Sequence, residues 1–247
     1  MEFAGKVAYV TGGGSGIGAA VARRLSDRGA DAVVVADVNA AAAEAVDVAD
    51  PAQVEKSIEA VIRAHGRLDV VVHAAGVDDP AAKQVIADAL LAGEPPQVTA
   101  RLEDAAWRRV MSVNLDGTFH VLGAALRVMT PVRAGAIVVV GSSASFDAPI
   151  GYAHYAASKA GVHALCQSVA KEAIAFGVRV NVVAPGPTDT GMAARTPEPL
   201  RHSLGDGRVR PYATPEEIAD VALFLAGDGA ANLVGAVLLA NGGRFTV

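Results

Sequence analysis

The chain has 247 residues, of which 52% are hydrophobic and 4% aromatic, and its formal net charge is −5. This length suits one α/β domain over residues 1–247, and the acidic balance gives no basic excess with which to bind nucleic acid. A lone cysteine excludes a disulfide framework. Without a signal sequence or an apolar run of membrane length, the chain is expected to be cytoplasmic, with no membrane partner.

Strands and helices alternate in the N-terminal half. Continuous apolar runs predict buried strands at residues 6–11, 31–37 and 68–73. Apolar residues at helical spacing predict a helix at 17–28, and a helix at 51–65 begins with proline and is followed by glycine.

The C-terminal half continues the alternation. Helices are expected at 103–129, 152–176 and 214–226, and strands at 135–141, 179–184 and 236–239. Continuous apolar strands between helices are typical of a parallel sheet that is covered on both faces. We therefore predict a three-layer, doubly wound α/β (Rossmann) fold with a mostly parallel sheet of about seven strands.

A glycine-rich turn, Thr11–Gly18, follows the first predicted strand and opens the first predicted helix. Glycines let the backbone approach a pyrophosphate, and the helix N-terminus offers it free N–H groups. Asp37 ends the second strand, where a carboxylate accepts hydrogen bonds from an adenosine ribose and repels a 2′-phosphate. No lysine or arginine lies in the turn or at Val38, so NAD is the predicted cofactor. A tight turn without ligand is the alternative interpretation.

Tyr155 and Lys159 are four residues apart in a predicted helix, which places an ammonium beside a phenol on one face. Ser142 precedes this pair, and the glycine turn precedes both. With these motifs in this order, the chain resembles a single-domain short-chain dehydrogenase/reductase of NAD type over essentially its whole length. The resemblance implies an oxidoreductase and, usually, a homotetramer.

The resemblance also implies which residues form the site. Its catalytic residues are Asn114, Ser142, Tyr155 and Lys159. Its cofactor-binding residues are Gly12, Ser15, Gly16, Ile17, Gly18, Asp37, Asp47, Val48, Ala74, Ala75, Gly76, Tyr155, Lys159, Pro185, Gly186, Thr188 and Thr190. His73 stands where the family usually has asparagine, and its side chain is assigned no chemistry.

Chemistry suggests a role for each catalytic residue. Tyr155 is the expected general base for alcohol oxidation and general acid for ketone reduction. Its pKa of about 10 must fall toward neutrality, and Lys159 together with a positive nicotinamide ring is the expected cause. Ser142 is expected to stabilise charge on the reacting oxygen. The resemblance implies that Asn114 holds a water that links Lys159 to solvent. No cluster has metal-ligand spacing, so no metal is predicted.

The chain departs from the family in two places. The connection from Asp37 to Asp47 is short, which predicts a trimmed or irregular sheet edge. The segment 77–101 is an insert that follows a strand end, and it can border the active site, form an oligomer interface or be a surface excursion.

Residues 191–212 are expected to form a substrate lid. Its basic residues are Arg195, Arg201, His202, Arg208 and Arg210. They either favour an anionic substrate or form a solvated charged surface, and the second interpretation is preferred because exposed arginine is usual. Phe146, Ile150 and Tyr152 suggest a largely apolar pocket wall.

The leading function is NAD(H)-dependent interconversion of a secondary alcohol and a ketone. A 3-oxoacyl-thioester reductase or 3-hydroxyacyl-CoA dehydrogenase shares every motif and is the enzymatic alternative. A non-catalytic NAD-sensing regulator on the same fold is the alternative of another class, since fold alone does not fix function. Such regulators typically lose the tyrosine or the lysine, and this chain keeps both.

Overall fold

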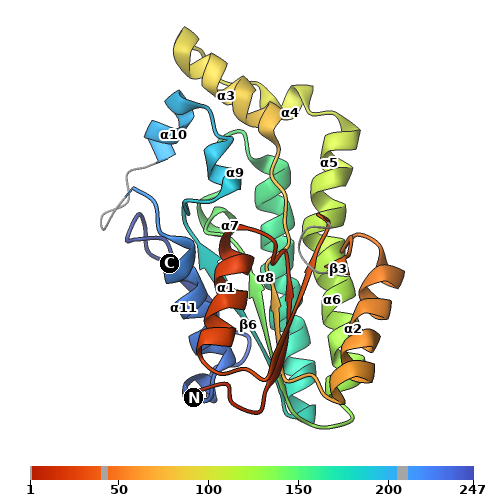
Figure 1. The fold of residues 1–247 in the computed structure, drawn as a ribbon. Coiled ribbons are helices and arrows are strands. Elements are labelled where there is room, and N and C mark those ends of the chain that lie inside the picture. The colour runs from red at the N-terminus through yellow and green to blue at the C-terminus, as the bar shows by residue number, and fades with distance from the viewer. Residues whose placement is uncertain (1, 40–43, 205–210) are drawn as a thin grey trace.

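A parallel sheet forms the middle layer of the molecule (Figure 1). The computed structural model describes residues 2–39, 44–204 and 211–247. The strands are β1 (Val7–Thr11), β2 (Ala32–Asp37), β3 (Glu44–Ala45), β4 (Val70–His73), β5 (Gly135–Val140), β6 (Val178–Pro185) and β7 (Val237–Ala240). They are ordered β3-β2-β1-β4-β5-β6-β7, and each neighbouring pair is parallel. The predicted doubly wound sheet is confirmed, with six longer strands and a two-residue strand β3.

Helices cover both faces of the sheet (Figure 1). One face packs against α1 (Gly16–Asp27) and α11 (Pro215–Ala226), and the other against α2 (Pro51–His65), α6 (Gly117–Met129) and α8 (Ala153–Ala173). The remaining helices are α3 (Pro80–Ala92), α4 (Val98–Arg101), α5 (Asp104–Met111), α7 (Ala144–Asp147), α9 (Gly191–Ala194) and α10 (Glu198–Leu204). Three further short turns are η1 (Ser112–Asp116), η2 (Ile174–Phe176) and η3 (Asp228–Ala230).

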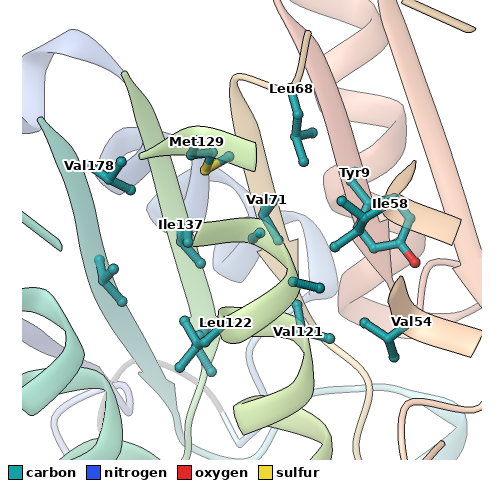
Figure 2. Close-up of a cluster of buried hydrophobic side chains, with 14 of the residues drawn as sticks. Tyr9, Val54, Ile58, Leu68, Val71, Val121, Leu122, Met129, Ile137 and Val178 are labelled. Carbon is teal, nitrogen blue, oxygen red and sulfur yellow. The ribbon is translucent and has the colours of Figure 1, made fainter. Parts of the chain in front are cut away.

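The two cores follow from the alternation of side chains along each strand. Tyr9 points toward α2 and α6, whereas its neighbours Ala8 and Val10 point toward α1 and α11. Figure 2 shows Ile58 of α2 and Leu122 of α6 in the first core, together with side chains of the sheet. Full burial of such a side chain stabilises the folded state by about 1.5–3 kcal/mol. The strand ends that carry the site are therefore held in place by a well-packed core.

Helix boundaries agree with the sequence where end signals are strong. Helix α2 begins at the expected proline, and Asp50 caps it by accepting bonds from the amides of its first turn. Helix α11 begins with a capping box between Thr214 and Glu217.

The long helix expected at 103–129 is continuous in direction but changes type. Residues Ser112–Asp116 form a π-helical turn between α5 and α6, and this turn carries Asn114. A π turn holds one extra residue, and such turns are frequent at functional sites. At the sheet edge, β3 pairs only two residues with β2, as the short connection after Asp37 led us to expect.

Candidate active site

The carboxyl ends of the central strands open into a cavity of about 850 Å³. Of the residues predicted for cofactor binding and catalysis, all except Asn114 line this cavity. The glycine turn and Asp37 lie in one part, and Ser142, Tyr155 and Lys159 lie in the other. Segments that are far apart in the sequence therefore meet where a doubly wound sheet usually binds its ligand.

Close packing explains two glycines of the turn. Gly12 has a φ of +63°, and a Cβ there would lie 2.6 Å from the amide nitrogen of Ala75. A Cβ on Gly18 would collide with the carbonyl of Gly12. Helix α1 starts directly behind the turn with no acidic residue in its first turn, so its free N–H groups can receive an anion.

The adenosine end of the cavity is defined by residues 37–39 and 46–49. The Asp37 carboxylate is 8% exposed and accepts the amides of Gly14 at 3.0 Å and Asn39 at 2.9 Å. Asp47 and Val48 line the same end. These two segments contribute two carboxylates and no cation to the cavity wall, which suits ribose hydroxyls better than a phosphate.

Tyr155 and Ser142 are hydrogen-bonded to each other in the other part of the cavity. Burial raises the pKa of Tyr155, and the bond with Ser142 opposes this rise. Lys159 donates from Nζ to the carbonyl of Val140 at 3.0 Å, and burial lowers its pKa to about 8. The sequence analysis expected Lys159 together with a positive nicotinamide ring to lower the tyrosine pKa, and this expectation for the cofactor-bound enzyme stays a prediction. In the protein alone, burial disfavours the phenolate more than Ser142 favours it.

His163 supports Ser142 and was missed in the sequence. Its Nε2 accepts the backbone amide of Ser142 at 3.3 Å. Burial lowers the pKa of His163 to about 4, with Lys159 as a further cause, so the ring is neutral and can accept this bond. Its position four residues after Lys159, on the same helix face, is the signal that could have revealed it.

Asn114 anchors the start of the insert. It is fully buried, accepts the amide of Val77 at 2.8 Å and donates to the Val77 carbonyl at 3.0 Å and to Ser158 Oγ at 3.0 Å. A Cβ on Gly76 would lie 3.3 Å from Asn114 Oδ1 and 3.4 Å from Lys159 Nζ, so these two side chains lie behind the same glycine. The side chain thus sits next to Lys159 without lining the cavity.

The insert borders the cavity and is fixed at its beginning. Asp78 is 4% exposed and forms an ion pair with Lys83 at 2.5 Å. Asp79 lies 3.2 Å from Nε2 of His154, which the sequence analysis had not linked to any partner. Val77, Asp78 and Lys83 of the segment 77–101 line the cavity, whereas Leu90 and Leu91 near the end of α3 are exposed.

The lid contacts the insert through polar and apolar side chains. Lys83 of α3 donates to Thr196 Oγ1 at 2.8 Å, and Arg195 reaches the Asp78 carboxylate at 3.4 Å. Ile86 of α3 and Leu200 of α10 belong to one buried apolar cluster, and Figure 1 shows these two helices side by side beyond the strand ends. The lid residues Arg208 and Arg210 lie outside the described part of the chain.

The expected apolar wall is only partly correct. Tyr152 lines the cavity, and its ring meets that of Tyr155 edge to face at 6.3 Å. Phe146 packs against His163 instead, and Ile150 is 77% exposed outside the cavity. Further cavity residues that the sequence analysis did not assign are Asp78, Lys83, Arg109, Asp147, Met192, Tyr212 and Arg244.

The described residues also bear on metal binding and on membrane insertion. Within residues 2–39, 44–204 and 211–247, no three His, Cys, Asp or Glu side chains are grouped so as to hold a metal ion. No helix in this part of the chain is long and apolar enough to span a membrane.

Comparison with known proteins places the chain in a family. The family model described as short chain dehydrogenase matches residues 6–200. A cis-4-hydroxycyclohexanecarboxylate dehydrogenase of Sinomonas cyclohexanicum is 37% identical over 261 residues, covering 99% of this chain and 98% of the relative. The 3-oxoacyl-(acyl-carrier-protein) reductase FabG of Escherichia coli (strain K12) is 33% identical over 260 residues, covering 100% of both chains. The crystal structure of gox2181 superposes with a TM-score of 0.84 at 29% identity, covering 97% of this chain and 95% of the other.

The chain belongs to the short-chain dehydrogenase family. It is therefore an oxidoreductase that acts on hydroxyl and keto groups and uses a nicotinamide cofactor. The predicted family and enzyme class are confirmed.

Proposed function

We propose that the protein is an NAD(H)-dependent oxidoreductase that interconverts a secondary alcohol and a ketone. The observation that carries this proposal is the hydrogen-bonded pair Ser142–Tyr155, which shares a cavity with the glycine turn and Asp37. A proton-transfer group and a dinucleotide cradle thus face one space, where an alcohol can approach both.

The residues present fit a dinucleotide. The missing side chain of Gly12 and the open N-terminus of α1 leave room and N–H donors for a pyrophosphate, and Asp37 offers a carboxylate to a ribose. Pro185, Gly186, Thr188 and Thr190 would hold the nicotinamide end. When bound, the nicotinamide ring supplies the hydride chemistry.

Each catalytic side chain has one task in this proposal. Tyr155 accepts the alcohol proton during oxidation and returns it during reduction. Ser142 donates a hydrogen bond to the reacting oxygen, while its Oγ accepts the Ala144 amide and its backbone amide is held by His163. Lys159 holds a ribose hydroxyl and, when charged, favours the phenolate of Tyr155. Asn114 positions Lys159 and the start of the insert, and the water relay implied by the resemblance runs beside it.

NAD is the proposed cofactor rather than NADP. The support is the buried Asp37 carboxylate and the lack of any lysine or arginine on segments 37–39 and 46–49 of the cavity wall. A 2′-phosphate there would meet a negative charge without a cation to pair with, which is unfavourable.

The proposed substrate class rests on the contacts between insert and lid beside the cavity. Lys83 and the apolar cluster join these two segments, which favours a compact alcohol such as a substituted ring over a long acyl chain. The 37% identical relative is named for a hydroxycyclohexane carboxylate, and FabG for an acyl thioester. A 3-oxoacyl-thioester reductase or 3-hydroxyacyl-CoA dehydrogenase is the second candidate.

We also propose a single cytoplasmic domain of 1–247 that assembles as a homotetramer. The exposed side chains of Trp107 on α5 and Phe119 on α6 give an apolar surface that suits self-association. Light scattering of the purified protein tests this state, and a monomer at micromolar concentration would contradict it.

A panel of alcohols and ketones tests the proposed function. Reduction of NAD⁺ should be fastest with a cyclic secondary alcohol, slower with NADP⁺, and slower with a 3-hydroxyacyl-CoA. Highest turnover on the thioester would favour the second candidate. Cofactor binding without turnover on any compound would favour the NAD-sensing regulator.

A further inference from the structure

Away from the adenosine end with Asp37 and Asp47, the cavity lining holds more cations than carboxylates. Besides Lys159, its charged residues are Lys83, Arg109, Arg195, Arg244, Asp78 and Asp147. Burial raises the pKa of Asp147, and the nearby Arg244 opposes this rise. A ligand in this part therefore meets a positive potential, which is strongest where a cation is incompletely paired.

Among these cations, Lys83 has no hydrogen-bond donor left with which to bind a ligand. Its ammonium is within 2.5 Å of Asp78, 2.8 Å of Thr196 Oγ1 and 3.4 Å of the Met192 carbonyl. An ammonium has three donors, and these three partners use all of them. Lys83 therefore links insert and lid and leaves no N–H for a substrate.

Arg195 is incompletely paired. Its single described ion pair is the 3.4 Å contact with Asp78, a carboxylate that lies closer to Lys83. Its side chain is 57% exposed and lines the cavity. A guanidinium has five N–H donors in a planar fork that matches a carboxylate, and no close partner is described for most of those of Arg195 within residues 2–39, 44–204 and 211–247.

Arg201, six residues further along the lid, provides a contrast. It pairs with Asp189, its guanidinium lies 5.3 Å from the centre of the Tyr212 ring, and it does not line the cavity. Arg201 thus makes contacts within the protein, whereas Arg195 lines the cavity. For Arg195, this difference favours the anionic-substrate interpretation over the solvated surface.

We propose that Arg195 binds a carboxylate of the substrate, so that the substrate is a compact hydroxy or oxo carboxylic acid. The inference rests on the proposed function and names its substrate class. The hydroxyl group lies at Ser142 and Tyr155, and the carboxylate lies under the lid. A phosphate of a thioester carrier shares the anionic chemistry, and the experiment separates the two sources.

The test compares a hydroxycycloalkane carboxylic acid with its methyl ester, which keeps the alcohol and removes the charge. The wild type should prefer the acid by about 10- to 100-fold in kcat/KM, the range expected for a charge-assisted hydrogen bond. Arg195→Gln should remove this preference by raising KM for the acid, with little change for the ester or for the cofactor. Arg195→Lys should keep part of the preference, and the matched control Arg201→Gln should keep all of it.

Three results would overturn the inference. They are an equal loss for acid and ester in Arg195→Gln, a loss confined to the KM of the cofactor, and a preference for an acyl-CoA over the acid. Binding of cyclohexanecarboxylate to the enzyme with NADH, measured by calorimetry, gives a readout without turnover and should fall about 10-fold or more in Arg195→Gln. Turnover of the ester without preference for the acid contradicts this inference alone, whereas a lack of turnover on every alcohol and ketone contradicts the proposed function.

Discussion

Replacing Lys83 with methionine tests whether the insert holds the lid. The change keeps the length of the side chain and leaves the Asp78 carboxylate, which is 4% exposed, without its 2.5 Å partner. Removing one partner of a buried ion pair costs about 3–5 kcal/mol. We expect about 3 kcal/mol, because Arg195 still reaches Asp78 at 3.4 Å.

This cost should appear as local opening of the lid. Lys83 joins α3 to Thr196, which follows α9, and neither Lys83, Asp78 nor Thr196 belongs to the two cores on the sheet faces, so we expect the strands to keep their stability. A loss of about 3 kcal/mol corresponds to about 100-fold more frequent opening. Hydrogen exchange measures this at the amides of Ala194 and Thr196, which donate to Thr190 at 2.9 Å and to Ala193 at 3.0 Å.

Controls separate the lid effect from general destabilisation. Exchange of Val138 in β5 should not change, and Arg108→Gln, which breaks an exposed ion pair with Asp104, should leave the lid amides as in the wild type. Asp78→Asn combined with Lys83→Met should open the lid less than the sum of the two single changes. A fall in lid protection below about fivefold, or an equal fall in β5, would refute the reasoning.

Three further predictions concern the cofactor site and its stability. Gly12→Ala should weaken NADH binding by about tenfold or more, because its Cβ would lie 2.6 Å from the Ala75 amide, whereas Gly123→Ala, with no neighbour within 4 Å, should bind normally in calorimetry. Asp37→Ala should lower kcat/KM for NAD⁺ about 10- to 100-fold and reduce the preference over NADP⁺, and unchanged preference in steady-state assays would contradict the assignment. Burial lowers the pKa of His73 from 6.5 to about 3, so the folded state binds this proton less readily than the unfolded state. The free energy of unfolding should therefore fall by up to about 1.4 kcal/mol per pH unit between about pH 6.5 and 3, and His73→Asn should show a shallower fall in urea titrations.

The fold was predictable where its signals are local. Helix α2 was placed correctly because Pro51 marks its start and Gly66, with a φ of +73°, ends it. The π turn around Asn114 was not predictable, because the sequence there is helical throughout. The side chain of Asn114, which this turn carries, bonds to Val77 and Ser158, and these contacts depend on the tertiary structure.

The site was predictable where its residues form a motif. The glycine turn, Asp37 and the Tyr155 pair carry their chemistry in spacing and chain order, and the structure brings them to one cavity. The partners of Lys83 could not be foreseen, since Thr196 is 113 residues away in the sequence. Such pairs depend on how insert and lid meet in space, which no local pattern encodes.

The position of Arg195 in the cavity could not be predicted from the sequence either. As one of several basic residues in the lid, it was indistinguishable from Arg201 in the sequence. Only the position of each guanidinium separates them, since one lines the cavity and the other stacks on Tyr212. The proposed substrate choice therefore depends on how residues 77–101 and the lid meet in space.

The central claim is that Tyr155 transfers the proton of the alcohol. The most direct measurement compares Tyr155→Phe with the wild type in NADH binding by calorimetry and in turnover of the best alcohol. The account predicts unchanged NADH affinity and a loss of turnover of at least about 100-fold, the lower range for a general acid–base group. Tyr9→Phe, which removes a buried hydroxyl bound to Ser57 in the core, should retain turnover. Retention of most activity in Tyr155→Phe would contradict the account.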